Sequence, residues 1–212
     1  MTEEEAKDWL ACHCRVSRET MEKLGAFVDA VIAENRHQNL ISAATVPEIW
    51  GRHVVDSAQL LTLHPEFDSA LPWLDLGTGA GFPGMIIAIL SDFPVILVES
   101  RRKRIDFLAR QAKKQGLGNV TIHGGRLETL ETQKASVISA RAFAPLSKLF
   151  ELAHRFSTEK TLWLLPKGRS AREELESARS SWQGVFHVEP SLTDADAAII
   201  VATGVSPRKN AR

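Results

Sequence analysis

The stretch Leu74–Gly84 reads LDLGTGAGFPG: an apolar run with one acid, Asp75, leads into residues 77–84, where four of the eight residues are glycine. In a regular helix or strand, each glycine costs roughly 0.5–1 kcal/mol relative to alanine. So dense a cluster predicts either a tight turn or a ligand that lies very close to the backbone. The sequence on both sides of the stretch indicates which of the two to expect.

Beyond this stretch, short apolar runs alternate with segments of helical spacing. Alternation of this kind predicts an α/β fold with a mostly parallel sheet and helices on both of its faces. Only a polar segment separates the last two apolar runs, so we expect an antiparallel strand to end the sheet. The expected strands are 73–76, 95–99, 120–123, 136–139, 161–165, 185–188 and 198–202, and the expected helices are 83–90, 103–115, 145–156 and 171–181.

The N-terminal part of the chain shows helical patterns in place of this alternation. After Ser17, which we expect to cap a helix, apolar residues recur at the spacing of one helix face. Thr45-Val46-Pro47-Glu48 has the spacing of a capping box. It predicts a second helix that runs to about Leu63 and ends at His64-Pro65.

Composition limits the class of protein. A length of 212 residues, 44% of them hydrophobic, is typical of one domain with a small appendage. With the patterns above, we expect an N-terminal helical extension, 1–65, and one α/β domain, 66–212. Its 26 basic and 26 acidic side chains cancel, so no overall attraction to nucleic acid or to a membrane follows. The first residues carry no apolar signal core and no run approaches a membrane span, so we expect a cytoplasmic protein. Cys12 and Cys14 lack a partner pair, so we expect helix residues and no metal site.

Two ligand-binding motifs overlap in the glycine-rich turn. Gly79–Gly84 matches the G-x-G-x-x-G pattern of dinucleotide binding, and Asp75–Gly81 matches D-x-G-x-G-x-G, the signature of S-adenosylmethionine-dependent methyltransferases. The dinucleotide pattern begins at the strand end, whereas here its first glycine comes two residues late. An acid at the strand end also suits the cationic amino group and sulfonium of S-adenosylmethionine. The register therefore favours this cofactor, and a NAD-dependent reductase is the alternative.

A second acid, Glu99, ends the next expected strand, 22 residues after Gly77. An acid about 20 residues beyond such a turn can accept hydrogen bonds from ribose hydroxyls. Both cofactors contain a ribose, so Glu99 supports a nucleoside ligand without choosing between them.

The turn continues as Phe82-Pro83-Gly84, and GTGAGFPG resembles the glucose-inhibited division protein B family, bacterial methyltransferases that act on guanine N7 in 16S ribosomal RNA. Six further segments resemble family motifs in the same order, although Ser42 stands in place of threonine and Pro166 where many members have leucine. Residues 169–212 resemble the family only weakly, and their role stays open. The six segments are NRHQNLISA (35–43), IWGRHVVDS (49–57), ESRRKRIDFL (99–108), LGNVTIHGGRLE (117–128), SARAFAPL (139–146) and LPKG (165–168).

The resemblance implies a Rossmann-like class I methyltransferase fold with a seven-stranded sheet. It also implies S-adenosyl-L-methionine as cofactor, with contacts at Gly77, Phe82, Leu127, Glu128 and Arg141. Together with the turn and the two strand-end acids, the candidate cofactor-binding residues are Asp75, Gly77, Thr78, Gly79, Gly81, Phe82, Glu99, Ser100, Arg126, Leu127, Glu128 and Arg141.

The expected reaction needs orientation and charge more than proton transfer. Guanine N7 has a free lone pair and no proton to remove, so no general base is required and positioning carries the rate. Arg141 and Lys167 follow the fourth and fifth expected strands and are the candidate catalytic residues. Because N7 must stay free, we expect them to hold guanine O6 or neighbouring phosphates.

Local charge supports an RNA substrate despite the zero net charge. Residues 101–114 hold seven basic side chains and one acid. Apolar residues at 105, 108, 109 and 112 are expected to mark the buried helix face, which leaves the basic side chains outward. The candidate RNA-binding residues are Arg52, His53, Arg101, Lys103, Arg104 and Lys167.

The substrate is expected to be an irregular part of the 16S ribosomal RNA. In an A-form helix, guanine N7 lies in a deep and narrow groove that side chains cannot enter. We therefore expect a loop or irregular fold, within a partly assembled small subunit, and an enzyme that acts as a monomer. A non-catalytic RNA-binding module is the second alternative, and it would not need Asp75 or Gly79.

Overall fold

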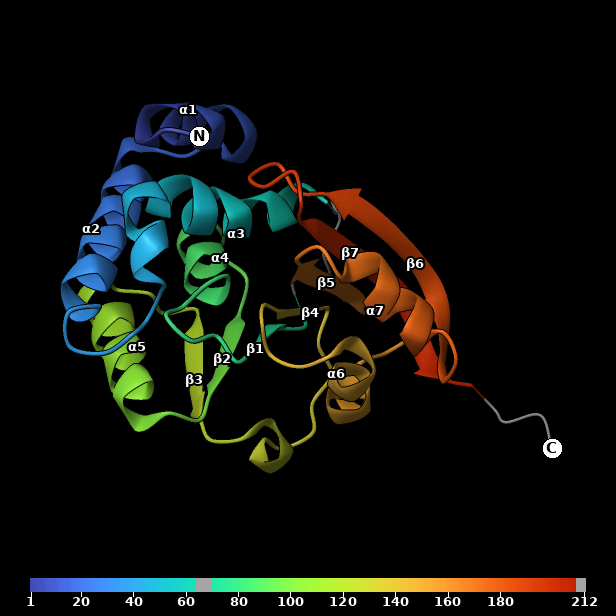
Figure 1. Ribbon diagram of the computed structural model, residues 1–212. Helices are drawn as coiled ribbons and strands as arrows, with labels where there is room; N and C mark the ends of the chain where they lie inside the picture. Colours follow the sequence, from blue (N-terminus) through green and yellow to red (C-terminus); the bar gives the residue numbers. More distant parts are fainter. Residues whose placement is uncertain (64–69, 209–212) are drawn as a thin grey trace.

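The computed structural model describes residues 1–63 and 70–208 and contains a seven-stranded sheet with the order β3-β2-β1-β4-β5-β7-β6 (Figure 1). Neighbouring strands among β1–β5 pair in parallel, and β7 pairs antiparallel with both β5 and β6. Each expected strand is confirmed: β1 and β2 have the expected bounds, and the other five have shifted ends. The strands are β1 (Trp73–Leu76), β2 (Val95–Glu99), β3 (Val120–Gly124), β4 (Val137–Ala140), β5 (Leu162–Lys167), β6 (Trp182–Pro190) and β7 (Ala198–Pro207).

The end of the sheet differs from the prediction. The antiparallel strand β7 lies one position inside the edge, and β6 forms the edge itself. A loop of residues 191–197 joins the two as a hairpin, and β7 is the better suited to the inner place because Ile199 and Ile200 are buried. Most of β6 is exposed, as an edge strand permits.

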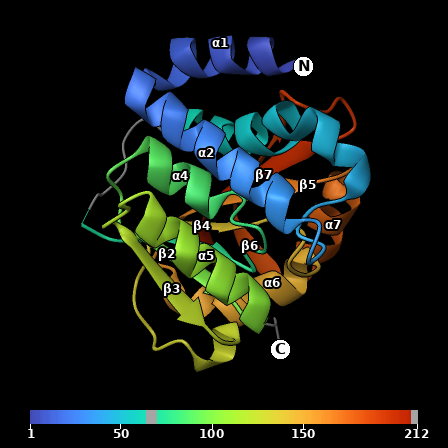
Figure 2. The ribbon, with the colours of Figure 1, turned by 90° about the vertical axis from the view of Figure 1, so that its left-hand side faces the viewer.

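Helices cover both faces of the sheet, as expected. α2 (Arg18–Glu34), α4 (Gly84–Leu90) and α5 (Arg102–Lys114) lie on one face, and α6 (Leu146–Ala153) and α7 (Ala171–Ala178) on the other (Figures 1 and 2). Each layer has its own hydrophobic cluster. Along β1, Trp73 packs into the first cluster and Leu74 and Leu76 into the second, as the alternation of a strand requires.

The N-terminal helices share the first of these clusters. α1 (Glu3–Cys14) contains both cysteines, as expected, and begins with a capping box between Thr2 and Glu5. α2 begins at the Ser17 cap that the sequence predicts. Leu10 of α1 and Phe27 of α2 lie in the same cluster as Trp73 of the sheet. The expected boundary between 65 and 66 lies outside the described residues.

The single helix expected from Thr45 is not formed. Thr45 lies inside a 3₁₀ helix, where its hydroxyl donates to the Ser42 carbonyl at 2.9 Å instead of capping a helix. A π-helical turn follows, a rare element that is frequent at functional sites. The expected end at His64-Pro65 lies outside the described residues. The elements are η1 (Ala43–Glu48), η2 (Trp50–Val55), α3 (Asp56–Ala58) and η3 (Gln59–Thr62).

The buried face of α5 is also rotated from the expected one. Phe107, Leu108 and Gln111 are buried, whereas Ala109 is exposed. The reason is the contact of α5 with α2, where the rings of Phe107 and Phe27 lie 6.3 Å apart. None of the described helices is long and apolar enough to cross a membrane.

Candidate functional site

The glycine-rich turn follows β1 at the carboxyl edge of the parallel strands. Gly77, Gly79 and Gly81 have φ angles of +64°, +60° and +103°, which other residues rarely adopt. A Cβ atom on Gly77 would lie 2.6 Å from the Phe143 ring, and one on Gly81 2.6 Å from Met85. At Gly79 the nearest atom would be 3.6 Å away. Two glycines thus allow close packing within the protein, and Gly79 leaves room for a ligand.

The Asp75 side chain points into the protein interior, where it binds the backbone of this turn, and it does not face solvent. Its side chain is fully buried, because its place opposite Ser139 in the sheet directs it toward α4. One carboxylate oxygen accepts the Gly84 amide at 3.0 Å and the other accepts the Ser139 hydroxyl at 2.7 Å. Burial raises the pKa of Asp75, and these hydrogen bonds oppose the rise. In place of the expected contact with a cationic ligand, Asp75 fixes the backbone that would hold one.

Glu99 ends β2 beside the turn. Its Oε1 accepts the amides of Ser100 and Arg101, both at 2.8 Å, which anchors the carboxylate. Its Oε2 accepts the Gly79 amide at 3.1 Å. An anchored carboxylate with one oxygen toward the turn fits the expected contact with ribose hydroxyls. Ser100 takes part through its backbone amide.

Arg104 belongs to the turn more than to the exposed basic surface. Its Nη1 lies 3.7 Å from Glu99 Oε2, and its Nη2 donates to the Asn39 carbonyl at 3.2 Å. Its side chain is only 21% exposed, whereas Arg101 and Lys103 are exposed residues at the start of α5. Of these three expected RNA-binding residues, Arg101 and Lys103 are therefore exposed to solvent, whereas Arg104 lies against Glu99.

The segment after β3 carries three of the expected cofactor residues. Leu127, in the 3₁₀ helix η4 (Leu127–Thr129), is buried in the cluster under α6, while Arg126 and Glu128 are exposed. Leu127 thus offers no free apolar surface here. Arg155, which was not predicted from the sequence, donates to the carbonyls of Leu127 and Leu130 at 2.8 and 2.9 Å and holds this segment in place.

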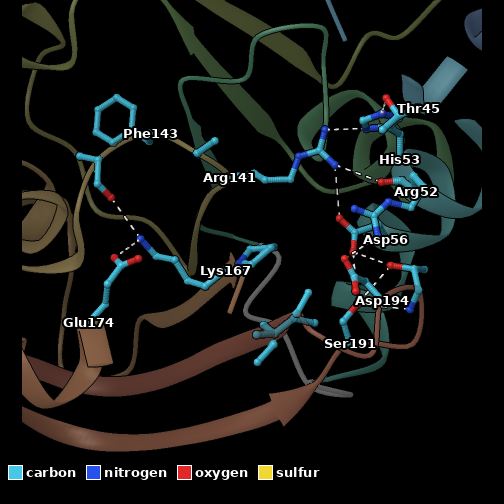
Figure 3. A pocket seen from close by; sticks show the side chains of 18 of the residues that line it. Thr45, Arg52, His53, Asp56, Arg141, Phe143, Lys167, Glu174, Ser191 and Asp194 are labelled. Carbon is cyan, nitrogen blue, oxygen red and sulfur yellow. Dashed lines mark hydrogen bonds and ion pairs between the residues drawn. The ribbon is translucent and has the colours of Figure 1, made fainter. Parts of the chain in front are cut away.

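A cavity of about 750 Å³ lies beside the turn, at the ends of β4 and β5 (Figure 3). We call it the β4–β5 cavity. The π-helical turn η2 and the loop of residues 191–197, here called the β6–β7 loop, supply further walls. Its size falls within the range of about 300–1,000 Å³ for small-molecule sites. Its charged or titratable lining residues are Arg52, His53, Asp56, Arg141, Lys167, Glu174 and Asp194.

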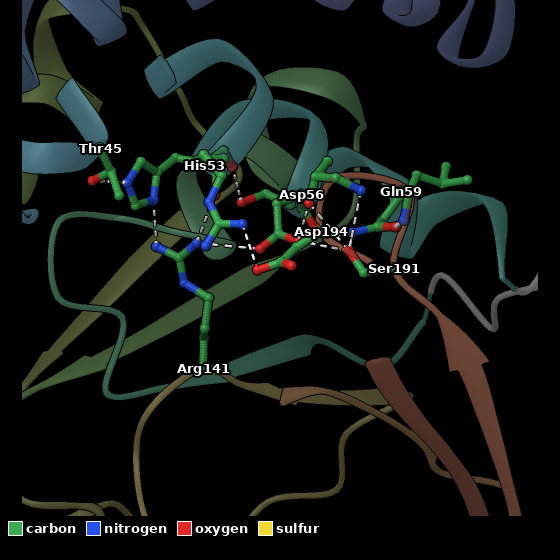
Figure 4. A network of polar contacts seen from close by, with 11 residues as sticks. Thr45, His53, Asp56, Gln59, Arg141, Ser191 and Asp194 are labelled. Atoms are coloured by element: carbon green, nitrogen blue, oxygen red, sulfur yellow. Dashed lines mark hydrogen bonds and ion pairs between the residues drawn. The ribbon is translucent and has the colours of Figure 1, made fainter. Parts of the chain in front are cut away.

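Arg141 leaves β4 and points into this cavity (Figures 3 and 4). It donates to His53 Nδ1 at 2.8 Å, to the Arg52 carbonyl at 3.3 Å and to Asp56 Oδ2 at 3.3 Å. The guanidinium carbon also lies 5.6 Å from the centroid of the Phe82 ring, in the glycine-rich turn. Arg141 thus contacts both the turn and the N-terminal segment.

His53 is held neutral between Arg141 and Thr45. Arginine has no acceptor, so Nδ1 must accept from Arg141 and the proton must lie on Nε2, which donates to Thr45 Oγ1 at 2.9 Å. Burial, followed by the charges of Arg141 and Arg52, lowers the pKa of His53 to about 3. The ring is 8% exposed and stacks on Phe82 at 5.0 Å. A neutral, buried ring does not offer the RNA phosphate contact that the sequence suggested.

Each cation of the β4–β5 cavity has a carboxylate partner. Arg52 pairs with Asp194 at 2.5 Å, and Lys167 pairs with Glu174 at 2.8 Å. Burial works to raise the pKa of Glu174, but its hydrogen bond with Lys167 and the charge of that lysine outweigh this and lower it. These carboxylates were not predicted from the sequence. Asp56 stood in the quoted segment IWGRHVVDS and could have been found there, whereas nothing local marks Glu174 or Asp194.

The strand order, the glycine-rich turn after β1 and the acid after β2 define a class I methyltransferase fold. The family model described as "rRNA small subunit methyltransferase G", GidB, matches residues 20–196. The chain belongs to this family, which confirms the resemblance seen in the motifs.

Relatives of the chain carry the same description. "Ribosomal RNA small subunit methyltransferase G" of Zymomonas mobilis is 56% identical and the alignment covers 99% of this chain and 97% of that protein. The protein of the same name from Rhizorhabdus wittichii is 55% identical, with coverage of 98% and 95%.

Solved structures share the fold at low sequence identity. A mutant of MtNAS in complex with S-adenosylmethionine has a TM-score of 0.59 and 16% identity, with coverage of 88% of this chain and 72% of that one. The glycopeptide N-methyltransferase MtfA in complex with the same ligand has a TM-score of 0.60 and 11% identity, with coverage of 71% and 93%.

The lowered pKa of His53 predicts a measurable pH dependence of stability. The unfolded chain binds a proton at this residue near its ordinary pKa of 6.5, whereas the folded chain does so only near 3. The stabilisation is therefore present above pH 6.5 and lost as the pH falls toward 3, by about 1.4 kcal/mol per pH unit. His53→Asn keeps an acceptor for Arg141 and removes this titration. In urea unfolding at about pH 6, 5 and 4, the wild-type advantage over His53→Asn should shrink. A constant difference would contradict the prediction.

Proposed function

We infer that this chain is an S-adenosylmethionine-dependent methyltransferase of small-subunit ribosomal RNA, and we propose N7 of a guanine in the 16S RNA as the methylated atom. One structural observation carries the inference. The glycine-rich turn, with its open face at Gly79, adjoins the β4–β5 cavity, because two residues that line this cavity also contact the turn: Phe143 lies against Gly77, and Arg141 lies over the Phe82 ring. The named relatives favour this activity over a NAD-dependent reductase and a non-catalytic RNA-binding module.

The residues around the turn fit the cofactor. Gly79 would let the cofactor approach the backbone, because the nearest described atom lies 3.6 Å from the place of a Cβ atom. Glu99 would hold the ribose hydroxyls through Oε2. When bound, S-adenosylmethionine supplies an electrophilic methyl group on its sulfonium. Asp75 contributes by fixing the turn through the Gly84 amide.

The β4–β5 cavity supports the proposed placement of guanine. The hydrogen bonds of Arg141 to described residues use Nη1 and Nη2 and leave Nε available for an acceptor such as guanine O6. His53 engages both ring nitrogens and stays neutral, so it is not poised to take up a proton. This agrees with a reaction at N7, where no proton is removed and orientation carries the rate.

Exposed cations at the start of α5 are proposed to meet the RNA backbone. Arg101 and Lys103 are exposed and lie just after β2, at the same sheet edge as the turn. We propose that residues 1–65 are an extension that walls the cavity and that 66–212 form the methyltransferase domain. We also propose that the enzyme acts as a cytoplasmic monomer on a partly assembled small subunit.

Cofactor binding should depend on the open face of Gly79. Gly79→Val would fill this face and strain a backbone at φ +60°, so we expect S-adenosylhomocysteine to bind more than about tenfold more weakly in calorimetry. Gly116→Val is the matched control, because Gly116 has φ +65° and open space but lies between α5 and β3. It should bind normally. Tight binding of NAD, without heat from S-adenosylhomocysteine, would overturn the cofactor assignment.

Methylation should depend on the shape of Arg141 as well as its charge. Arg141→Lys keeps a cation beside Asp56 but lacks the planar set of donors that reaches His53, Arg52 and Asp56, so we expect a rate loss of roughly 10²-fold with thermal unfolding close to wild type. Arg141→Ala should lose stability as well, because it leaves Asp56 without its cation. Reverse-transcription mapping of N7-methylguanosine in 16S RNA, with and without the protein, measures the effect. Near-normal methylation by Arg141→Lys would refute the assignment of this residue.

RNA affinity should depend on salt through the start of α5. Arg101→Glu with Lys103→Glu should weaken RNA binding, and the slope of log K against log salt should fall by about 0.7–0.9 for each phosphate that these side chains neutralise in the wild type. Arg104 is left intact because it lies against Glu99 and would alter the cofactor site. Lys148→Glu on α6, on the opposite helical layer, is the control. An unchanged slope in the double variant would show that Arg101 and Lys103 do not contact RNA phosphates and are only exposed to solvent.

A further inference from the structure

One carboxylate, that of Asp56, joins three segments that are distant in sequence (Figure 4). Its Oδ2 lies 3.3 Å from Nη1 of Arg141, at the end of β4. Its Oδ1 accepts the Thr193 hydroxyl of the β6–β7 loop at 2.9 Å and the Gln59 amide of its own segment, also at 2.9 Å. The Ser191 hydroxyl lies 3.4 Å from the same oxygen. The side chain of Asp56 is 15% exposed, so solvent screens these contacts only in part.

The N-terminal segment holds the β6–β7 loop in place at several points. Besides the bonds to Asp56, the Leu192 amide donates to Gln59 Oε1 at 3.0 Å, and Arg52 pairs with Asp194. Ser191, Thr193 and Asp194 line the β4–β5 cavity. The position of this cavity wall therefore depends on contacts with a segment more than 130 residues earlier in the chain.

The two oxygens of Asp56 couple the cavity wall to Arg141. A displacement of the carboxylate that suits the loop on Oδ1 would lengthen the contact of Oδ2 with the guanidinium, and the reverse also holds. A partly buried carboxylate is stable here only while its cation stays beside it, since an unpaired buried charge is costly. Neither partner can therefore move without a cost at the other.

We propose that Asp56 is a positioning residue for methyl transfer, which acts by orienting Arg141 and by holding the β6–β7 loop in place. This proposal rests on the proposed function, because it assigns a role in the same reaction. It differs from a purely structural role in one respect. Its effect on methylation passes through Arg141, so the two residues should not act independently.

The central experiment is a double-mutant cycle with Asp56→Asn, which keeps the size of the side chain and removes its charge. We expect the kcat/KM for methylation of small-subunit RNA to fall roughly 10–100-fold, while the affinity for S-adenosylhomocysteine stays within about threefold. In the Arg141→Lys background, Asp56→Asn should cost less than about threefold more. Asp196→Asn is the matched control, because Asp196 lies on the same loop and the substitution removes its exposed ion pair with Arg169, which precedes α7. It should stay within about twofold of wild type.

Hydrogen exchange tests the loop without any RNA. Asp56→Asn should speed the exchange of the amides of residues 191–197, and Asp196→Asn should not. If Asp56→Asn fails to fold, Thr193→Val removes the hydroxyl that bonds Oδ1, and should both speed this exchange and slow methylation about 3–10-fold.

Three results would overturn the proposal: wild-type methylation by Asp56→Asn, effects of Asp56→Asn and Arg141→Lys that multiply, or unchanged exchange of the loop. Failure of the wild-type protein to methylate the RNA would instead refute the proposed function. The exchange experiment would still decide whether Asp56 seats the loop.

Discussion

The buried carboxylate of Asp75 is the constraint on which the site depends. It lies in the middle of the sheet and accepts the Gly84 amide and the Ser139 hydroxyl, and Ser139 in turn accepts the Trp73 indole at 2.8 Å. A buried carboxylate without such partners costs several kcal/mol. The end of the turn and the strand β4 are therefore fixed relative to each other. Gly84 has no alternative here, because a Cβ atom would lie 2.7 Å from Asp75 Oδ2 and 2.2 Å from Leu97.

Phe82 links the turn that Asp75 holds to the β4–β5 cavity, because its ring contacts His53 and Arg141, which both line this cavity. The ring follows directly from the turn that Asp75 holds, and His53 stacks on it at 5.0 Å. Arg141 leaves β4 two residues after Ser139, and its guanidinium meets both rings. The glycine-rich turn and the β4–β5 cavity are thus joined by the mutual contacts of Phe82, His53 and Arg141. The N-terminal segment, which supplies His53, completes it.

The sequence could predict what depends on local pattern. Apolar runs locate the strands because a strand covered on both faces must be apolar, and the glycine cluster locates the turn that requires positive φ. The sequence could not predict which way the Asp75 side chain points, because this depends on Ser139, 64 residues later. Nor could it predict the pairing of Arg104 with Glu99. The order of β6 and β7 likewise depends on which strand buries more apolar surface. The π-helical turn at Trp50–Val55 has no local signal beyond a helical pattern.

The charges of the β4–β5 cavity indicate what kind of group can occupy it. Its three cations, Arg52, Arg141 and Lys167, face three carboxylates, those of Asp194, Asp56 and Glu174, and His53 is neutral. A phosphate in this space would have to compete with a carboxylate for every cation. A neutral base could instead accept a hydrogen bond from an oriented donor such as Arg141 Nε without displacing a carboxylate from its cation. We therefore propose that the base occupies this cavity and that exposed cations such as Arg101 and Lys103 contact the phosphates, so that different parts of the surface orient the base and attract the RNA.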